Sequence, residues 1–345
     1  MDHAPSIASQ VQQMARALGF HLAGIAPVAG ADDGPPEAQG FSQWVAEGRA
    51  GEMEYLKRRD ASGAYLRSSL RVPFPWARSV IVCAVSYNTP QPRSIDPAPE
   101  GTGWIARYAW SGRAVQGEAS GNAQSARTEA TDYHAVVLER LELLKEKLQV
   151  ELGTFIARCF VDTGPVAERT YAQHAGLGWQ GKNTCLIHEK FGSWIFLGTV
   201  VTSLELPREE WAAPHADRCG SCTRCLDACP TQCLTPYRMD ASRCIAYLTI
   251  EKRGEIAKEL QPAIGRNVFG CDICQEVCPW NRRAPVTDWP ELSARPELVN
   301  PALEWLSGLD EAQFRAIFRK SPVSRAKHAG LQRNVAIAMQ NRQRQ

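Results

Sequence analysis

The segment Cys219-Gly-Ser-Cys222-Thr-Arg-Cys225-Leu-Asp-Ala-Cys229-Pro230 decides the fold of the chain around it. Its C-x2-C-x2-C-x3-C-P spacing is the bacterial-type ferredoxin signature, in which three cysteines hold one 4Fe–4S cluster and the fourth binds a second cluster. A shorter run, Cys271-Asp-Ile-Cys274-Gln-Glu-Val-Cys278-Pro279, follows downstream. The chain is therefore predicted to bind two 4Fe–4S clusters and to move electrons one at a time.

The cluster ligands divide into two sets. The second run has only three cysteines and needs a further thiolate, for which Cys244 is the nearest candidate. Because the fourth ligand of each run crosses to the other cluster, eight of the twelve cysteines are used. The predicted sets are Cys219, Cys222, Cys225 and Cys278 for one cluster, and Cys229, Cys244, Cys271 and Cys274 for the other.

Other roles for these cysteines fit the spacing less well. Zinc also takes four thiolates from C-x2-C pairs, but it does not call for a third cysteine at the same spacing followed by C-P. Disulfide frameworks mark small secreted domains, and this chain has 345 residues. The remaining thiols are interpreted as small apolar side chains: Cys83, Cys159, Cys185 and Cys233. Cys233 is close to the first run, so a ligand role is open to it, although the two clusters do not need it.

Length and composition describe an ordinary soluble protein of two or three domains, with 44% hydrophobic and 22% charged residues. No stretch approaches the roughly 20 apolar residues of a membrane span. The N-terminus, Met1-Asp2-His3, lacks the basic start and apolar core of a secretory signal and has no twin-arginine pair. Free thiols and oxygen-sensitive clusters then predict a reducing, cytoplasmic location.

The charge is unevenly distributed at the C-terminal end. From Arg315 onward there are eight Lys or Arg residues and no acidic residue. Such a segment is a candidate contact for a nucleic-acid backbone. A solvated helix face with a frayed tail explains the same charges and is favoured when they are taken alone.

Helices and strands alternate in the first part of the chain, which predicts an α/β domain. Helices are expected at 6–20, ending at Gly19, and at 132–149, with Leu138, Leu141, Leu144 and Leu148 facing inward. Apolar runs predict strands at 79–87, 155–161 and 194–202. A final helix is indicated by the spacing of Leu331, Val335, Ala338 and Met339.

Three domains follow from this pattern. Residues 1–206 form the α/β domain, 207–285 the ferredoxin-like domain that holds the clusters, and 286–345 a basic helical segment. Within the first, residues 111–130 are rich in Gly, Ala, Ser, Gln and Asn, which predicts a flexible surface insertion.

Three further motifs are candidates for ligand binding or catalysis. Gly176-Leu-Gly178-Trp-Gln-Gly181 matches the dinucleotide fingerprint, but a helix is expected before it at 168–174 and a strand after it, so a helix cap and a tight turn are favoured. That turn could still let the backbone approach an anionic or extended ligand.

The motif Asp132-Tyr-His134 begins like a cobalamin axial-histidine motif but lacks its glycine, so His134 is not expected to be a ligand. Asp162 follows a predicted strand. It is read equally as a proton donor in a partly dry pocket or as the N-cap of the next helix.

These motifs together resemble the bacterial epoxyqueuosine reductase family, which acts in the last step of queuosine biosynthesis in tRNA. The resemblance runs from about Gly51 to Pro285 and includes both cysteine runs. The segment Ser324–Asn341 resembles the start of the family's helical, HEAT-like region, which is short here. The segments that carry it are Gly51-Glu-Met-Glu-Tyr-Leu-Lys-Arg58, Ile105-Ala-Arg-Tyr108-Ala, Asp132-Tyr-His134, Val161-Asp162-Thr-Gly-Pro-Val-Ala-Glu-Arg169, Ala175-Gly-Leu-Gly-Trp-Gln-Gly-Lys-Asn183 and Arg243-Cys-Ile-Ala-Tyr-Leu-Thr-Ile250.

The resemblance implies a fold and an activity. The fold is an α/β cobalamin-binding domain, then a two-cluster ferredoxin domain, then a short helical segment. The activity is reduction of epoxyqueuosine to queuosine at the anticodon wobble position of tRNA. The family pattern makes Asp162 the proton donor, and residues in the matching motifs line the cofactor or substrate pocket: Arg58, Tyr108, Asp162, Gly181, Lys182 and Asn183.

The expected partners are tRNA and a low-potential electron donor such as flavodoxin or ferredoxin, for a monomeric enzyme that does not bind membranes. Two rival functions remain. A reductive dehalogenase also couples two clusters to cobalamin, but such enzymes usually carry a twin-arginine signal. A pure electron-transfer module would need neither Asp162 nor about 200 residues of α/β domain before the clusters.

Overall fold

The computed structural model describes residues 5–28, 40–115, 127–213 and 215–343. They form two compact units. Unit 1 combines residues 1–86 and 134–222, and unit 2 combines residues 87–133 and 223–345. The predicted domain boundaries at 206 and 285 stay predictions. Three expectations fall partly outside the described residues, namely those for the N-terminal residues Met1-Asp2-His3, for the centre of the insertion at 116–126 and for Arg344.

Unit 1 is organised by a four-stranded sheet in the order β1-β2-β9-β6. Its helices and strands alternate along the chain as predicted, but all three strand pairings are antiparallel. Every residue of β2 is buried, as its continuous apolar run predicts. The strands are β1 (Leu22–Pro27), β2 (Ser79–Ser86), β6 (Ala157–Phe160) and β9 (Ile195–Thr202), with a separate hairpin of β7 (Trp179–Gln180) and β8 (Leu186–Ile187).

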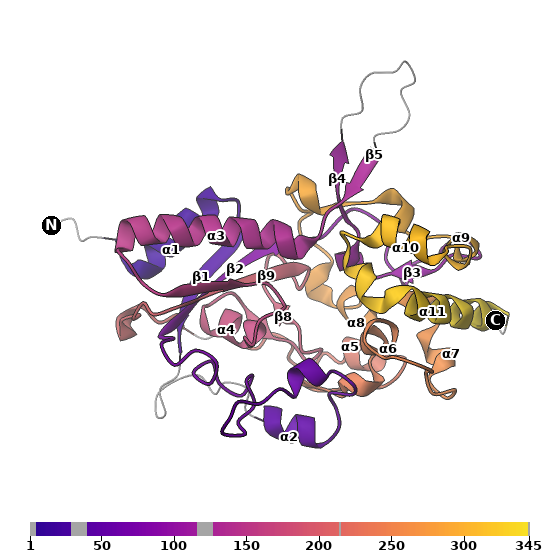
Figure 1. Cartoon of the computed structure of the whole chain (residues 1–345), viewed down its shortest axis with the longest axis horizontal. Coiled ribbons are helices and arrows are strands. Elements are labelled where there is room, and N and C mark those ends of the chain that lie inside the picture. Colours follow the sequence, from indigo (N-terminus) through magenta and orange to yellow (C-terminus); the bar gives the residue numbers. More distant parts are fainter. Residues whose placement is uncertain (1–4, 29–39, 116–126, 214, 344–345) are drawn as a thin grey trace, which may run out of the picture. The chain divides into compact units, whose positions relative to one another are not determined.

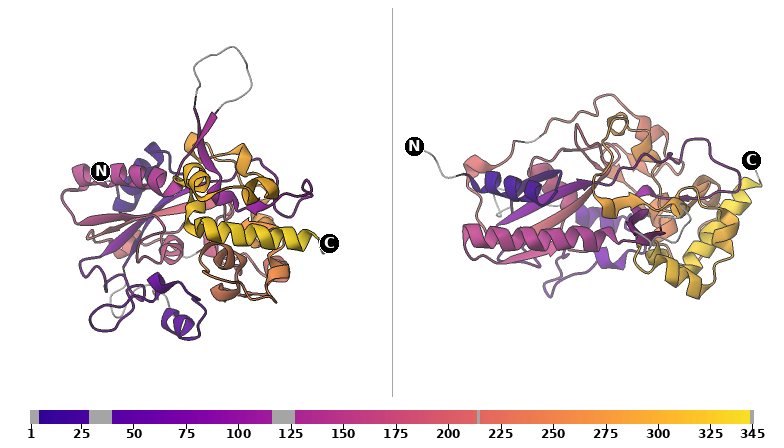
Figure 2. Two further views of the ribbon diagram at one scale, coloured as in Figure 1. Left: turned by 45° about the vertical axis from the view of Figure 1, so that its right-hand side comes forward. Right: turned by 90° about the horizontal axis from the view of Figure 1, so that it is seen from above.

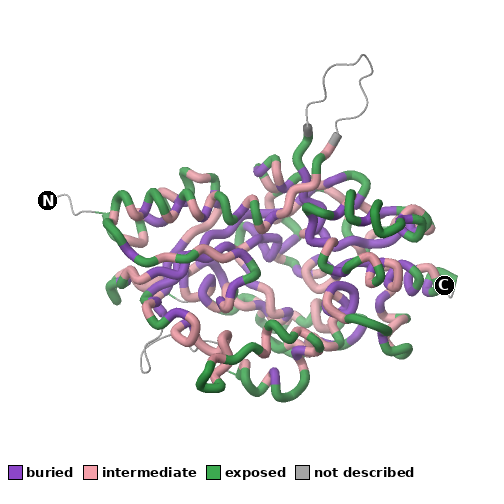
Figure 3. The backbone as a smooth tube through the Cα atoms, in the orientation of Figure 1, coloured by how far each residue is buried: buried purple, intermediate pink, exposed green. Residues whose placement is uncertain are grey.

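Helices cover both faces of this sheet, which explains why its central strands are apolar on both sides (Figures 1 and 2). Alternate residues of β2, such as Val80 and Val82, pack with Tyr171 and Ala172 of α4. Figure 3 shows the central strands as largely buried, and Leu197 of β9 is their one half-buried residue. The helices of this unit are α1 (Ile7–Ala17), α2 (Phe41–Ala46), α3 (Tyr133–Leu152) and α4 (Glu168–His174).

Helix α3 packs on β9 along a slightly different face from the one predicted. Leu141, Leu144 and Leu148 are fully buried, as expected. The prediction for Leu138 is wrong, because its side chain is 37% exposed and Val137 is buried instead. Gly198 of β9 explains the close approach, since a Cβ added there would lie 2.6 Å from Leu141 and 2.9 Å from Val137.

Unit 2 has an apolar core in which the C-terminal helices pack against β3 and β12. Trp104, Val268, Leu303 and Leu331 are among the buried members of this core. The predicted C-terminal helix is confirmed as α11. The helices are α5 (Arg224–Asp227), α6 (Ile245–Ile250), α7 (Gln261–Ile264), α8 (Ile273–Glu276), α9 (Leu303–Ser307), α10 (Glu311–Phe318) and α11 (Lys327–Arg342).

The strands of unit 2 are short. β3 pairs with β12 in parallel, β10 pairs with β11, and β4 lies between β5 and β13. Their bounds are β3 (Trp104–Ile105), β4 (Ser111–Val115), β5 (Arg127–Ala130), β10 (Leu234–Thr235), β11 (Arg238–Met239), β12 (Asn267–Phe269) and β13 (Ser293–Ala294).

The insertion predicted at 111–130 is wrong at both ends, which are the paired strands β4 and β5. β4 also pairs with β13, so its residues are fixed by neighbours that are remote in sequence. At Gly112 an added Cβ would lie 2.8 Å from the carbonyl oxygen of Glu129 and 2.5 Å from the Arg295 side chain. Gly112 is needed for this close approach, and composition alone does not distinguish such a strand glycine from a loop glycine.

Among the helices in the described ranges, none combines the length and apolar character that crossing a membrane requires.

Candidate active site and cluster ligands

Asp162 lies on the loop between β6 and α4. Its φ is 58°, in the left-handed region that few residues other than glycine adopt, and such strain is often found at functional sites. The interpretation of Asp162 as a helix N-cap is wrong, because the N-cap of α4 is Ala167 and makes no side-chain capping bond. The dry pocket expected around Asp162 is also absent, since its side chain is 68% exposed.

Two other groups hold this loop. His134, at the start of α3, places Nε2 3.5 Å from Oδ2 of Asp162. Glu168, the first residue of α4, accepts a hydrogen bond from the Asp162 backbone N–H at 2.8 Å. The Asp162 carboxylate is therefore exposed to solvent, while Glu168 holds the backbone of the loop.

The more buried carboxyl group of this site is that of Glu168, which is half-buried. Burial raises its pKa to about 8, and the nearby negative charge of Asp162 acts in the same direction. Arg67 is close enough for its charge to oppose this effect, and burial lowers the pKa of its own guanidinium. At neutral pH the site thus holds a mostly protonated Glu168 next to the exposed Asp162.

The glycine motif follows α4 and contains β7, so it does not join a strand to a helix, and the prediction that it is no dinucleotide fingerprint is confirmed. Gly178 is required by a close approach, because a Cβ there would lie 2.1 Å from the carbonyl oxygen of Ile187. Asn183 is buried, and its Oδ1 accepts a hydrogen bond from the backbone of Cys185 at 3.2 Å. At Gly181 a Cβ would lie 2.8 Å from that same Oδ1.

Lys182 links this turn to the first cysteine run. Its Nζ donates hydrogen bonds to the carbonyl oxygens of Gly220 at 2.6 Å and Cys222 at 3.1 Å. The nearby ion pair between Arg218 and Glu189, with 2.6 Å between nitrogen and oxygen, supports the same segment. The turn therefore fixes the backbone on which the first two predicted ligands lie.

The other two predicted pocket residues lie in separate units. Arg58 is in an exposed part of unit 1, where its carbonyl oxygen accepts a hydrogen bond from the Leu66 N–H at 3.0 Å. Tyr108 belongs to unit 2 and packs edge-on against Tyr133, with 6.1 Å between ring centroids.

The twelve cysteines all lie in the described part of the chain and are free thiols. In unit 2, Sγ of Cys229 lies 3.5 Å from Sγ of Cys233. A hydrogen bond from Cys233 lowers the pKa of the Cys244 thiol, and the charges of Cys244 and Cys271 affect one another. Two of the four predicted ligands of the second set, Cys229 and Cys244, thus lie next to Cys233, which the sequence placed near the clusters but left without a role.

The first predicted set is divided between the units. Cys219 and Cys222 end unit 1, whereas Cys225 and Cys278 belong to unit 2. In the described ranges no three His, Cys, Asp or Glu side chains are arranged to share a single metal ion.

Comparison with known proteins gives the type of cluster domain and the family. Residues 218–281 match the model of a 4Fe-4S double cluster binding domain, and residues 67–163 match the model described as epoxyqueuosine reductase QueG, DUF1730. An epoxyqueuosine reductase of Synechocystis is 41% identical over 323 residues, which span 92% of this chain and all of the relative. The chain belongs to the epoxyqueuosine reductase family.

Solved structures of epoxyqueuosine reductases are similar along almost the whole chain. One, solved with an epoxyqueuosine-modified tRNA-Tyr stem loop, has a TM-score of 0.78 at 27% identity and covers 96% of this chain and 80% of its own. Another, from Bacillus subtilis, has its catalytic aspartate loop swung out of the active site; its TM-score is 0.77 at 26% identity, covering 96% of this chain and 81% of its own.

The predictions of an epoxyqueuosine reductase family oxidoreductase with two 4Fe–4S clusters are confirmed. Sequence reasoning missed Glu168 and Arg67, and it set His134 aside once the axial-ligand motif proved incomplete. Glu168 and His134 had a usable signal, because both lie within segments that carry the resemblance.

Proposed function

We propose that this chain reduces epoxyqueuosine to queuosine at the anticodon wobble position of tRNA, with Asp162 as the proton donor. The observation that carries the proposal is the exposed Asp162 on its strained loop, backed by His134 and Glu168, in a chain of this family. The tRNA stem loop in a similar structure supports the substrate.

Asp162 is suited to meet an incoming substrate. Converting an epoxide to an alkene takes up two electrons and two protons and releases one water molecule. Asp162 donates the first proton to the epoxide oxygen as the ring opens. The second proton completes the departing water. Glu168, which is mostly protonated at neutral pH and accepts the Asp162 backbone N–H, is the proposed source of the proton that Asp162 takes up before it donates. The catalytic aspartate loop of the Bacillus subtilis relative supports this role.

The cofactors follow from the same reasoning. Cobalamin, when bound, supplies the cobalt centre through which electrons reach the substrate, and each cluster passes them singly. The exposed Asp162 carboxylate is accessible to a cofactor and substrate placed against unit 1, while the His134 imidazole already faces that carboxylate. We propose that Arg58, Tyr108, Gly181, Lys182 and Asn183 line the cofactor or substrate pocket. We also propose that the eight cysteines bind the two clusters in the sets that their spacing predicts.

The proposal extends to the partners of the enzyme. The basic residues from Arg315 onward would bind tRNA phosphates. A reduced carrier such as flavodoxin or ferredoxin would supply electrons to a monomeric enzyme in the cytoplasm.

The test is an anaerobic incubation of the protein with cobalamin, a low-potential reductant and tRNA that carries epoxyqueuosine. Nucleosides from the digested tRNA are then analysed by mass spectrometry. The proposal predicts that the modified nucleoside loses one oxygen atom. An unchanged nucleoside, with reducible clusters and bound cobalamin, would contradict it and favour another cobalamin-dependent reduction, which a halogenated aromatic substrate would then test.

A further inference from the structure

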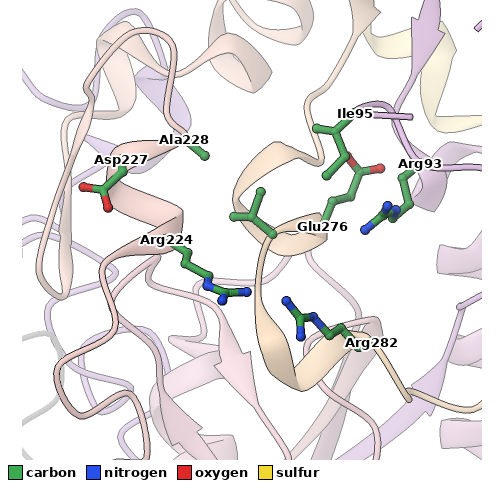
Figure 4. A pocket seen from close by; sticks show the side chains of 8 residues that line it. Arg93, Ile95, Arg224, Asp227, Ala228, Glu276 and Arg282 are labelled. Carbon is green, nitrogen blue, oxygen red and sulfur yellow. The ribbon is translucent and has the colours of Figure 1, made fainter. Parts of the chain in front are cut away.

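An open pocket of about 500 Å³ lies in unit 2, on the segments that carry the cysteine runs. Arg93, Arg224 and Arg282 line it, and Figure 4 shows their guanidinium groups approaching it from three different segments. No cysteine is among its lining residues, so the pocket is distinct from the cluster sites themselves.

The positive charge of this pocket is only partly neutralised. Arg93 pairs with Asp96 at 2.6 Å. Within the described part of the chain, neither Arg224 nor Arg282 has an ion pair or a side-chain hydrogen bond. An anionic partner would therefore find two guanidinium groups able to bind carboxylates or phosphates.

The two acidic residues that line the pocket are engaged with other groups. Asp227 accepts a hydrogen bond from the Thr223 hydroxyl at 2.7 Å. Glu276 accepts hydrogen bonds from the backbone N–H of Ser94 at 2.7 Å and from the Ser94 hydroxyl. These bonds hold both carboxylates away from a tight pairing with Arg224 or Arg282.

The pocket adjoins predicted ligands of both clusters. Arg224 and Ala228 directly precede Cys225 and Cys229, and Val277 directly precedes Cys278. Because successive Cα atoms are about 3.8 Å apart, three points of the pocket wall lie one residue from a cluster thiolate. A redox group bound here would be next to the clusters.

We propose that this arginine pocket is the docking site for an acidic electron-carrier protein, whose surface carboxylates pair with Arg224 and Arg282. The proposal rests on the two clusters of the proposed function but not on its substrate. Interfaces between redox proteins are small and the complexes are transient. Complementary charge raises the association rate of such complexes more than their affinity. A tRNA phosphate is the alternative occupant, but contact with RNA gives no reason for the pocket to adjoin the ligands of both clusters.

The experiment measures cluster reduction in the anaerobic holoprotein by stopped-flow absorbance, without tRNA. Reduced flavodoxin is the acidic protein donor, and the methyl viologen radical cation is the small donor that needs no docking. The variants are Arg224→Glu, Arg282→Glu and the double variant, with Arg282→Lys as the charge-conserving form. Arg283→Glu is the matched control, because Arg283 is exposed, adjacent and not part of the pocket wall.

We expect the double variant to react with flavodoxin at least about tenfold more slowly at low ionic strength, and to lose most of its salt dependence. Arg282→Lys and Arg283→Glu should each retain more than about half of the rate, as should every variant with methyl viologen.

Three results would overturn the proposal. One is an equal loss of rate in Arg282→Glu and Arg283→Glu, and another is equal slowing with both donors. The third is weaker tRNA binding in a filter assay with an unchanged reduction rate, which would assign the pocket to RNA. Failure of the proposed function alone would leave cluster reduction as predicted.

Discussion

Replacing Glu168 by glutamine tests the electrostatics of the site most sharply. Glutamine keeps an oxygen that can accept the Asp162 backbone N–H but cannot ionise. Burial raises the pKa of Glu168 from 4.5 to about 8, so the folded protein retains a proton that the unfolded chain releases. The free energy of unfolding therefore falls as the pH rises from about 4.5 to about 8, and it is level above that range.

The size of this effect follows from the shift. Each pH unit within the window costs at most about 1.4 kcal/mol, which gives an upper bound of about 2.7 kcal/mol between pH 6 and pH 8. Glu168 is not fully buried and its titration is influenced by Asp162, so about 1–2 kcal/mol is expected.

The assay is anaerobic urea unfolding of the holoprotein at several pH values between 6 and 8.5. Glu168→Gln should gain about 1–2 kcal/mol relative to the wild type as the pH rises across this window. Glu205→Gln is the control, because the Glu205 side chain is 84% exposed. A difference between Glu168→Gln and wild type that stays constant with pH would refute the assignment of Glu168 as a protonated group.

Three further predictions concern packing and the cysteine run. Lys182→Met removes both hydrogen bonds to the backbone of the first cysteine run. We therefore expect a lower iron content per protein and faster amide hydrogen exchange at 219–222. A wild-type iron content would contradict this role of Lys182. Gly178→Ala should cost about 1–3 kcal/mol in urea unfolding through its clash with the Ile187 carbonyl, and a neutral effect would show that the turn relaxes freely. Val137→Ala should cost about 2 kcal/mol and Leu138→Ala less than about 1 kcal/mol, and the reverse order would contradict the orientation of α3.

Local patterns predicted most elements of unit 1. The apolar run at 79–87 contains the fully buried strand β2, and the helix expected at 6–20 is α1, with Val11 and Ala15 buried. Leu138 shows the limit of this reasoning. It lies at the edge of the apolar stripe, and only the position of Gly198 in the facing strand decides that Val137 packs inward instead.

The site was predicted less completely than the fold, because its members meet only in three dimensions. Asp162 was singled out by its place after a strand, but no local pattern indicates that Glu168 and not Asp162 is the more buried carboxyl group. His134 comes from a different helix, and its distance to Asp162 depends on how α3 packs on the sheet. The cysteines could be recognised from the sequence alone, because cluster geometry restricts their spacing along the chain.

The most direct test of the central claim is a single turnover with Asp162→Asn. The variant is reduced anaerobically with cobalamin bound, its clusters are checked by electron paramagnetic resonance, and epoxyqueuosine tRNA is then added. We predict normal cluster signals and at least about a hundredfold slower loss of the epoxide oxygen than in the wild type, as expected when a general acid is removed. Wild-type conversion by Asp162→Asn with intact clusters would contradict the account, because Asp162 could then not be the proton donor.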